Sequence, residues 1–118
     1  MSDIPIGGGG AGNTFGKGFV YVMEDTKRNQ AKIGCSRDPE NREKQLQRGR
    51  PDTTLVGYTK ANEMNRAETA AQHAVEKHLG MEKVERNATD WYHLPKGVTS
   101  EDVYDRARRA VYDHNRKN

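Results

Sequence analysis

The sequence has few of the features that mark secreted and membrane proteins. Only one of its 118 residues is a cysteine, Cys35, so the chain can form neither an internal disulfide nor a zinc site built from several cysteines. No apolar run approaches the length of about eighteen residues that a membrane helix needs, and no basic-then-apolar secretory signal opens the chain. Apolar residues make up only 32% of the chain, which predicts one domain with a small core. We therefore expect an intracellular protein of the cytoplasm or the nucleus.

Positive charge is concentrated in one segment of the chain. The formal net charge is +3, but residues 27–50 alone carry eight basic and three acidic side chains, a net charge of +5. The basic residues of this segment are Lys27, Arg28, Lys32, Arg37, Arg42, Lys44, Arg48 and Arg50. Such a segment predicts salt-dependent binding to nucleic-acid phosphates. It is equally typical of a charged face that only keeps a protein in solution, and charge alone leaves both interpretations open.

The first half of the chain reads as a tail followed by strands. Glycine dominates residues 1–17 without apolar periodicity, which predicts a flexible tail. Residues 18–24 and 30–35 are rich in β-branched and aromatic side chains and predict two strands. The short polar connection between them indicates an antiparallel hairpin. A third strand is predicted over residues 53–59.

Three helices are predicted by their caps and by apolar periodicity. Asp38 is a favourable N-cap and precedes a proline, which predicts a helix over residues 39–47. Residues 63–79 have the clearest apolar stripe in the chain. A short extended segment over residues 90–94 follows, and a last amphipathic helix begins at Thr99.

The order of the elements is strand, strand, helix, strand, helix, edge segment and helix. The simplest packing for that order is an α+β fold with a three-stranded antiparallel sheet flanked by helices. We expect a domain over residues 18–95, preceded by the tail of residues 1–17. An amphipathic helix within residues 96–118 is expected to pack on that domain.

Two charged residues are predicted to face inward. Glu68 borders the apolar stripe of the helix over residues 63–79. Arg42 lies four residues before Leu46, the only large apolar residue of the helix over residues 39–47. Because unpaired charge near a core is costly, each needs a partner or a ligand. Periodicity favours an ion pair between Arg42 and Glu68, and the functional alternative is a phosphate-binding arginine beside a metal-binding carboxylate.

The spacing of several residues resembles the GIY-YIG nuclease superfamily. That superfamily has two tripeptides on neighbouring strands of a hairpin, an arginine on the next helix and a glutamate on the helix after it. Residues 19–21 (Phe-Val-Tyr) and 32–34 (Lys-Ile-Gly) occupy the tripeptide positions, and Arg42 and Glu68 the charged ones. Residues 90–92 (Asp-Trp-Tyr) resemble a late motif of the branch described as a phage-type DNA-binding domain, which is related to a fungal meiotically up-regulated group.

The chain also departs from the superfamily pattern. Only the tyrosine of the first tripeptide is kept, and Lys32 stands where the second usually has tyrosine. The histidine or tyrosine that often follows the arginine is missing, and the late asparagine is not identified, although Asn87 is available. These departures bear on catalysis more than on the fold or on DNA binding.

The resemblance, which covers roughly residues 18–95, implies a DNA endonuclease that hydrolyses phosphodiester bonds with a divalent cation. Glu68 would hold one Mg²⁺ or Mn²⁺ ion, Arg42 a nonbridging phosphate oxygen, and Tyr21 the attacking water, which it would orient or deprotonate. Lys32 would supply positive charge near the tyrosine or contact phosphate directly. The further residues expected to contact DNA are Lys27, Arg28, Arg37, Lys44, Arg48 and Arg50.

Two other functions remain open at this point. The first is a non-catalytic DNA-binding module that retains the fold, which Lys32 in place of the second tyrosine favours. The second is a protein-interaction domain whose basic segment only aids solubility. The joint presence of Tyr21, Arg42 and Glu68 favours the nuclease.

Overall fold

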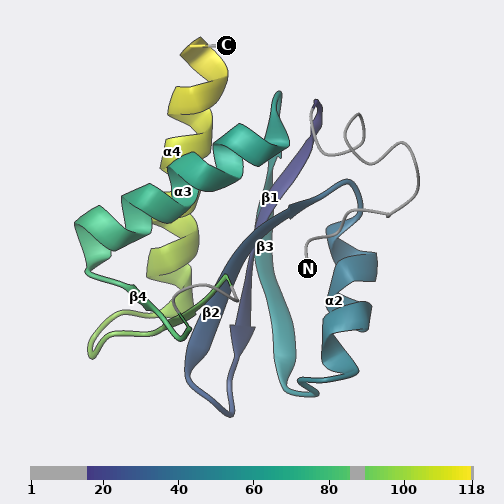
Figure 1. Cartoon of the computed structure of the whole chain (residues 1–118), viewed down its shortest axis with the longest axis vertical. Helices are drawn as coiled ribbons and strands as arrows, with labels where there is room; N and C mark the ends of the chain where they lie inside the picture. Colours follow the sequence, from purple (N-terminus) through teal and green to yellow (C-terminus); the bar gives the residue numbers. More distant parts are fainter. Residues whose placement is uncertain (1–15, 86–89, 118) are drawn as a thin grey trace.

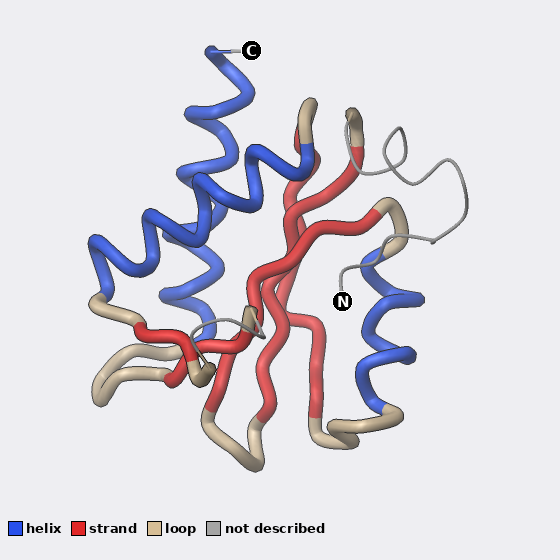
Figure 2. Tube along the Cα trace, viewed as in Figure 1, coloured by secondary structure: helices blue, strands red, loops and turns tan. Residues whose placement is uncertain are grey.

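The structure of the chain is a computed structural model that describes residues 16–85 and 90–117. The tail expected over residues 1–17 lies outside the described residues except for its last two, and so does Asn87. The described residues form an α+β fold in which an antiparallel sheet lies between helices (Figures 1 and 2). None of the described helices combines the length and the hydropathy needed to cross a bilayer.

The sheet has five strands in the order β3-β1-β2-β5-β4. The strands are β1 (Gly18–Asp25), β2 (Gln30–Ser36), β3 (Thr53–Ala61), β4 (Glu82–Lys83) and β5 (Trp91–His93). The described helices are α2 (Pro39–Gln47), α3 (Met64–Leu79) and α4 (Ser100–Lys117). Figure 1 shows α3 and α4 together on one side of the sheet and α2 alone on the other.

The expectation of a three-stranded sheet is therefore wrong. The segment expected as a separate edge forms β5, which pairs with the first half of β2 through Ala31 and Tyr92. β4 then pairs with β5 and extends the sheet by one more strand. Strands of two and three residues are too short to carry a period-two pattern, so no sequence signal marked their place in the sheet.

One face of the sheet forms the core with α3 and α4. Val20 and Val22 of β1 lie opposite Cys35 and Ile33 of β2 and are buried on this face. The helices complete this core with Met64, Ala67, Ala71, Val75, Val103, Ala107 and Val111. The predominance of alanine on α3 lets the helix approach the sheet closely.

The other face of the sheet carries the residues that matter for the site. Phe19, Tyr21 and Met23 of β1 alternate with the core residues and so point to the side of α2. In β2, Gly34 lies opposite Tyr21 and Lys32 lies opposite Met23. This face is therefore the one on which the tripeptide residues of the two strands meet.

The helix ends follow the capping signals. Oδ1 of Asp38 accepts the backbone N–H of Asn41 at 3.1 Å, which confirms the N-cap of α2. α3 ends at Gly80, whose φ of 66° is left-handed. Thr99 and Asp102 exchange reciprocal backbone-to-side-chain hydrogen bonds of 3.0 and 3.1 Å, which confirms the start of α4.

The outer edge of β3 is covered by side chains of two helices. In its first half, Oε2 of Glu43 on α2 accepts the N–H of Leu55 at 2.8 Å. Nε2 of Gln47, also on α2, donates to the carbonyl of Thr53 at 2.9 Å. These bonds satisfy edge groups that no neighbouring strand reaches.

α4 covers the second half of the same edge. The hydroxyl of Tyr104 donates to the carbonyl of Tyr58 at 3.0 Å, and Nδ2 of Asn115 donates to the carbonyl of Lys60 at 3.0 Å. A Cβ at Gly57 would lie 2.7 Å from the Tyr104 ring, so this ring packs where β3 has no side chain. α4 is thus hydrogen-bonded to β3 near both of its ends.

Candidate functional site

The Tyr21 side chain crosses β2 at Gly34. Tyr21 and Gly34 are directly opposite in the β1–β2 pair, and Tyr21 is only 1% exposed. A Cβ on Gly34 would lie 2.5 Å from Cζ of Tyr21 and would overlap its hydroxyl. The phenol therefore occupies the space that any larger residue at this position would need.

The Glu68 carboxylate reaches the same stretch of β2 from α3. Oε1 of Glu68 accepts the Sγ–H of Cys35 at 3.2 Å, and Oε2 accepts Nε2 of Gln72 at 3.3 Å. Gln72 also donates to the carbonyl of Ile33 at 3.2 Å. The carboxylate is thereby held beside the residues on both sides of Gly34, beyond the point where β5 stops pairing with β2.

The phenol and the carboxylate thus border one glycine from opposite sides of the strand. Tyr21 belongs to the α2 face of the sheet, whereas Glu68 is carried by a helix on the core face. At Gly34 β2 has neither a side chain nor a paired β5 residue, so the phenol and the carboxylate lie on either side of an uncovered stretch of the strand. This junction is the candidate functional site.

Arg42 is half-buried on α2, the helix on the Tyr21 side of the sheet. Its Nη1 donates to Oε1 of Gln45 at 3.0 Å, one turn further along the helix. Because α2 lies on this side (Figure 1), Arg42 and Tyr21 belong to the same face of the sheet, and a joint action of the two on one phosphate stays a prediction.

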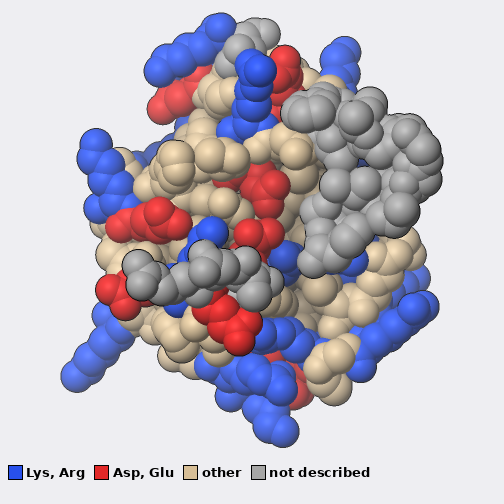
Figure 3. Space-filling model, in the orientation of Figure 1, with Lys and Arg blue, Asp and Glu red and all other residues tan. Residues whose placement is uncertain are grey.

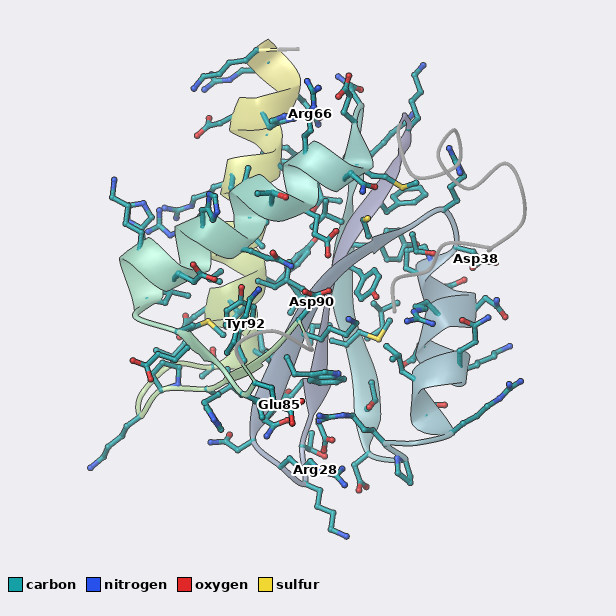
Figure 4. All side chains as sticks on the ribbon, viewed as in Figure 1. Arg28, Asp38, Arg66, Glu85, Asp90 and Tyr92 are labelled. Carbon is teal, nitrogen blue, oxygen red and sulfur yellow. The ribbon has the colours of Figure 1, made fainter. Side chains whose placement is uncertain are left out.

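Lys32 lies on the same face of β2 as Gly34, one pair further along. Its side chain is 8% exposed, and its Nζ lies 3.6 Å from Oδ2 of Asp90. In Figure 4 Asp90 lies near the middle of the molecule, in front of the sheet. Lys32 is thus a buried cation held by a carboxylate of the Asp-Trp-Tyr segment.

Tyr92 of that segment points to the core face. Its hydroxyl donates to Oε2 of Glu76 at 2.7 Å. Burial raises the pKa of Tyr92 well above its usual range, and the hydrogen bond to Glu76 adds to the shift. The negative charges of Asp90 and Glu68 act in the same direction, so the phenol stays protonated and serves as a donor.

Trp91 of the Asp-Trp-Tyr segment contacts Arg50, one of the basic residues of segment 27–50. The Arg50 guanidinium carbon lies 3.9 Å from the centre of the Trp91 ring, and Nη1 donates to Oδ2 of Asp25 at 3.1 Å. Asp25 is fully buried and also accepts Nη1 of Arg28 at 3.0 Å. Burial acts to raise the pKa of Asp25, but hydrogen bonds from Arg28 and Arg50 outweigh it, so the pKa lies below its ordinary value.

The six residues expected to contact DNA occupy different environments. Five of them are exposed: Lys27, Arg28, Arg37, Lys44 and Arg48. Arg50 is the exception, because its side chain is engaged by Asp25, Gln30 and Trp91. Figure 3 shows basic side chains along the lower edge of the molecule and on the side of α2.

Oxygen ligands for a cation are present only in part. Among the described residues no group of three or more histidine, cysteine, aspartate or glutamate side chains is placed to hold a metal ion. Besides the Glu68 carboxylate, Oδ1 of Asn65 lies 3.7 Å from the Cys35 sulfur. One carboxylate and one amide oxygen fit a hard cation that keeps most of its water, as Mg²⁺ does.

The residues that hold Glu68 were not found from the sequence. Cys35 is 8% exposed, and its hydrogen bond to Glu68 was not anticipated. Gln72 lies one helical turn after Glu68, and that spacing is the only sequence signal that would have suggested it.

Comparison with known proteins identifies the family of the chain. The model of the T5orf172 domain matches residues 18–111, from the start of β1 into α4. Neither the curated proteins nor the solved structures gave a match. The chain therefore belongs to the T5orf172 domain family, a DNA-binding and nuclease-associated module found in phage-type endonuclease-like proteins.

Proposed function

We propose that the protein is a DNA endonuclease of the GIY-YIG type that hydrolyses phosphodiester bonds with one divalent cation, Mg²⁺ or Mn²⁺. The observation that supports this most directly is that Tyr21 lies against Gly34 while Glu68 is hydrogen-bonded to the neighbouring Cys35, so that a phenol and a carboxylate border the same stretch of β2.

Each side chain has a distinct role in this proposal. Tyr21 orients the attacking water, whose oxygen bonds to phosphorus as the bond to the leaving oxygen breaks. Arg42 binds a nonbridging oxygen, a task that suits a planar guanidinium. Glu68, with the amide oxygen of Asn65, holds the cation, which supplies charge neutralisation at the phosphate and the leaving oxygen.

A non-catalytic DNA-binding module is the second candidate, and Lys32 favours it. Its ammonium group lies 3.6 Å from the Asp90 carboxylate and is buried, so its charge is already partly compensated. A lysine in this state is a poor substitute for a hydroxyl that would contact water or phosphate. The two candidates share DNA binding and differ only in cleavage.

Nicking of supercoiled plasmid separates the two candidates. We expect the wild-type protein to nick DNA with Mg²⁺ or Mn²⁺, and EDTA to stop it. Glu68→Gln keeps the shape of the side chain and removes its charge, so nicking should fall about 100-fold or more while DNA binding persists. Glu76→Gln is the matched control on the same helix, because it removes one carboxylate charge two turns away and keeps an acceptor for Tyr92.

The nuclease proposal fails if wild-type protein and Glu68→Gln bind the plasmid equally and both leave it intact. The protein would then be a non-catalytic DNA-binding module. A salt-independent interaction with DNA would contradict both candidates, because phosphate contacts weaken as salt rises.

A further inference from the structure

An exposed aromatic side chain lies next to Tyr21 on the α2 face of the sheet. Tyr58 of β3 is directly opposite Tyr21 of β1, so both point to the same face. Tyr58 is nevertheless 42% exposed. Its ring meets Phe19 edge to face, with centroids 5.2 Å apart and an angle of 78° between planes. A large apolar surface is thus exposed one strand away from the candidate site.

Basic residues flank this aromatic pair. Lys60 is opposite Phe19 on β3, and Ser36, which Arg37 follows, is opposite Phe19 on β2. Lys60 and Arg37 are both exposed. The exposed Tyr58 ring, with Phe19 packed edge to face against it and cations nearby, matches the chemistry of a nucleotide, whose base has a π-face and whose phosphates are anionic.

We infer that Tyr58 and Phe19 bind an unstacked nucleobase beside the cleaved bond, so that the substrate is DNA with a single-stranded region. This inference rests on the proposed function and names the substrate class of its site. In an intact duplex the faces of the bases are stacked on one another and are out of reach of a protein ring. A flap, a gap or a single strand offers them freely.

A second exposed tyrosine provides a matched control. Tyr112 on α4 is 49% exposed and lies 5.6 Å from the Arg108 guanidinium. Its basic neighbours are bound to acids of the same helix, since Arg109 pairs with Asp105 at 3.1 Å and Arg116 with Asp113 at 2.7 Å. Arg108 is also paired with Asp105, so the positive charges around Tyr112 are compensated within α4, although Tyr112 is about as accessible as Tyr58.

Binding of labelled oligonucleotides in EDTA tests the inference without cleavage. The full chain would be titrated by fluorescence anisotropy against single-stranded, flapped and blunt duplex DNA of one length. We expect Tyr58→Ala to weaken single-strand and flap binding about tenfold or more and duplex binding less than about twofold. Tyr58→Phe should bind as the wild type does, and Tyr112→Ala should change neither affinity.

A base analogue reports on stacking itself. 2-Aminopurine placed in the single-stranded region should be quenched by the wild type and by Tyr112→Ala, and not by Tyr58→Ala. If Tyr58→Ala is poorly folded, Tyr58→Ile keeps a strand-forming residue without a ring and carries the same expectation.

The inference is overturned if Tyr58→Ala leaves single-strand affinity unchanged or weakens duplex binding to the same extent. A change of oligomeric state in Tyr58→Ala, seen by sedimentation equilibrium, would instead assign this surface to a second copy of the chain. Loss of nicking in Glu68→Gln is independent of these measurements, so the two proposals fail separately.

Discussion

At the residue scale, glycine is required at position 34 because the Tyr21 ring occupies the space that a side chain would need. The phenol fills the space above the strand, and the Glu68 carboxylate is fastened to the residues beside it. A methyl group at this position would push the ring away from the junction. The geometry of the site therefore depends on a residue that takes no part in the chemistry.

We predict that Gly34→Ala lowers both activity and stability. The added Cβ would displace the buried Tyr21 ring, which should cost about 1–3 kcal/mol in the free energy of unfolding. Nicking should fall with it, because the hydroxyl would no longer lie at the junction. Urea unfolding and plasmid nicking measure the two effects.

Gly49→Ala is the control for this substitution. A Cβ at Gly49 would meet no atom within 4 Å beyond its chain neighbours, so the unfolding free energy should change by less than about 0.5 kcal/mol. Equal effects of the two substitutions would contradict the role assigned to Gly34.

The residues of the candidate site were only partly predictable. Tyr21, Arg42 and Glu68 could be proposed as site residues from their spacing, because the separation of residues along the chain can be read directly from the sequence. The contacts of Glu68 with Cys35 and Gln72 were not predictable. They depend on how α3 is turned and shifted on β2, which no local pattern encodes.

At the scale of elements, the buried Asp25 joins the β1–β2 turn to the loop after α2. It accepts the backbone N–H groups of Lys27 and Arg28 at 3.1 Å each, and guanidinium groups from Arg28 and Arg50. Arg50 in turn stacks on Trp91 of β5. Three parts of the chain that are distant in sequence, namely the β1–β2 turn, the loop after α2 and β5, are therefore connected through Asp25 and Arg50.

We predict that Asp25→Asn reduces stability in a pH-dependent way. An asparagine presents an N–H group to one of the two guanidinium groups, so unfolding at pH 7 should become easier by about 2–4 kcal/mol. The pKa of Asp25 is lowered by folding, so its stabilisation is complete above the unfolded value of about 3.9 and is lost as pH falls through the folded pKa.

Urea unfolding at a series of pH values tests this prediction. The difference between wild type and Asp25→Asn should be largest near neutral pH and should shrink in acid. Asp52→Asn, an exposed position just before β3, should track the wild type throughout. A constant difference between wild type and Asp25→Asn at all pH values would show that the carboxylate charge is not what stabilises this region.

The longer elements were predicted well and the shortest were not. The helices α2 and α3 and the strands β1 to β3 lie within one or two residues of their expected bounds, and α4 begins within one residue of Thr99, because caps and periodicity are local signals. The polar end expected over residues 115–118 is instead helical as far as Lys117. β4 and β5 have only two and three residues. Their strand character comes from pairing at the open edge of β2, which is a tertiary effect.

At the scale of the whole molecule, folding places exposed basic residues of segment 27–50 at one end of the sheet. Lys44 on α2 and Arg48, the C-cap of that helix, are exposed, and the turn that carries Lys27 and Arg28 lies at the same end of the sheet (Figures 1 and 3). Composition predicted this excess of charge but not the special position of Arg50, which is engaged by Asp25 and Trp91.

We predict that Lys44→Gln with Arg48→Gln weakens DNA binding through salt-sensitive contacts. Loss of two phosphate contacts should reduce the slope of log affinity against log salt by about 1.8, since each contact contributes about 0.9. Anisotropy titrations at several salt concentrations measure the slope. Lys77→Gln with Lys96→Gln removes the same charge from exposed positions elsewhere and should change the slope by less than about 0.5.

The covered margin of β3 has a consequence for crowding. Glu43 and Gln47 from one helix and Tyr104 and Asn115 from another occupy backbone groups that a foreign strand would use to join the sheet. If many copies bound side by side on one stretch of DNA, the β3 edges of neighbouring copies would have these backbone groups already hydrogen-bonded. High local concentration on a nucleic acid therefore need not lead to fibre-like polymerisation through this flank.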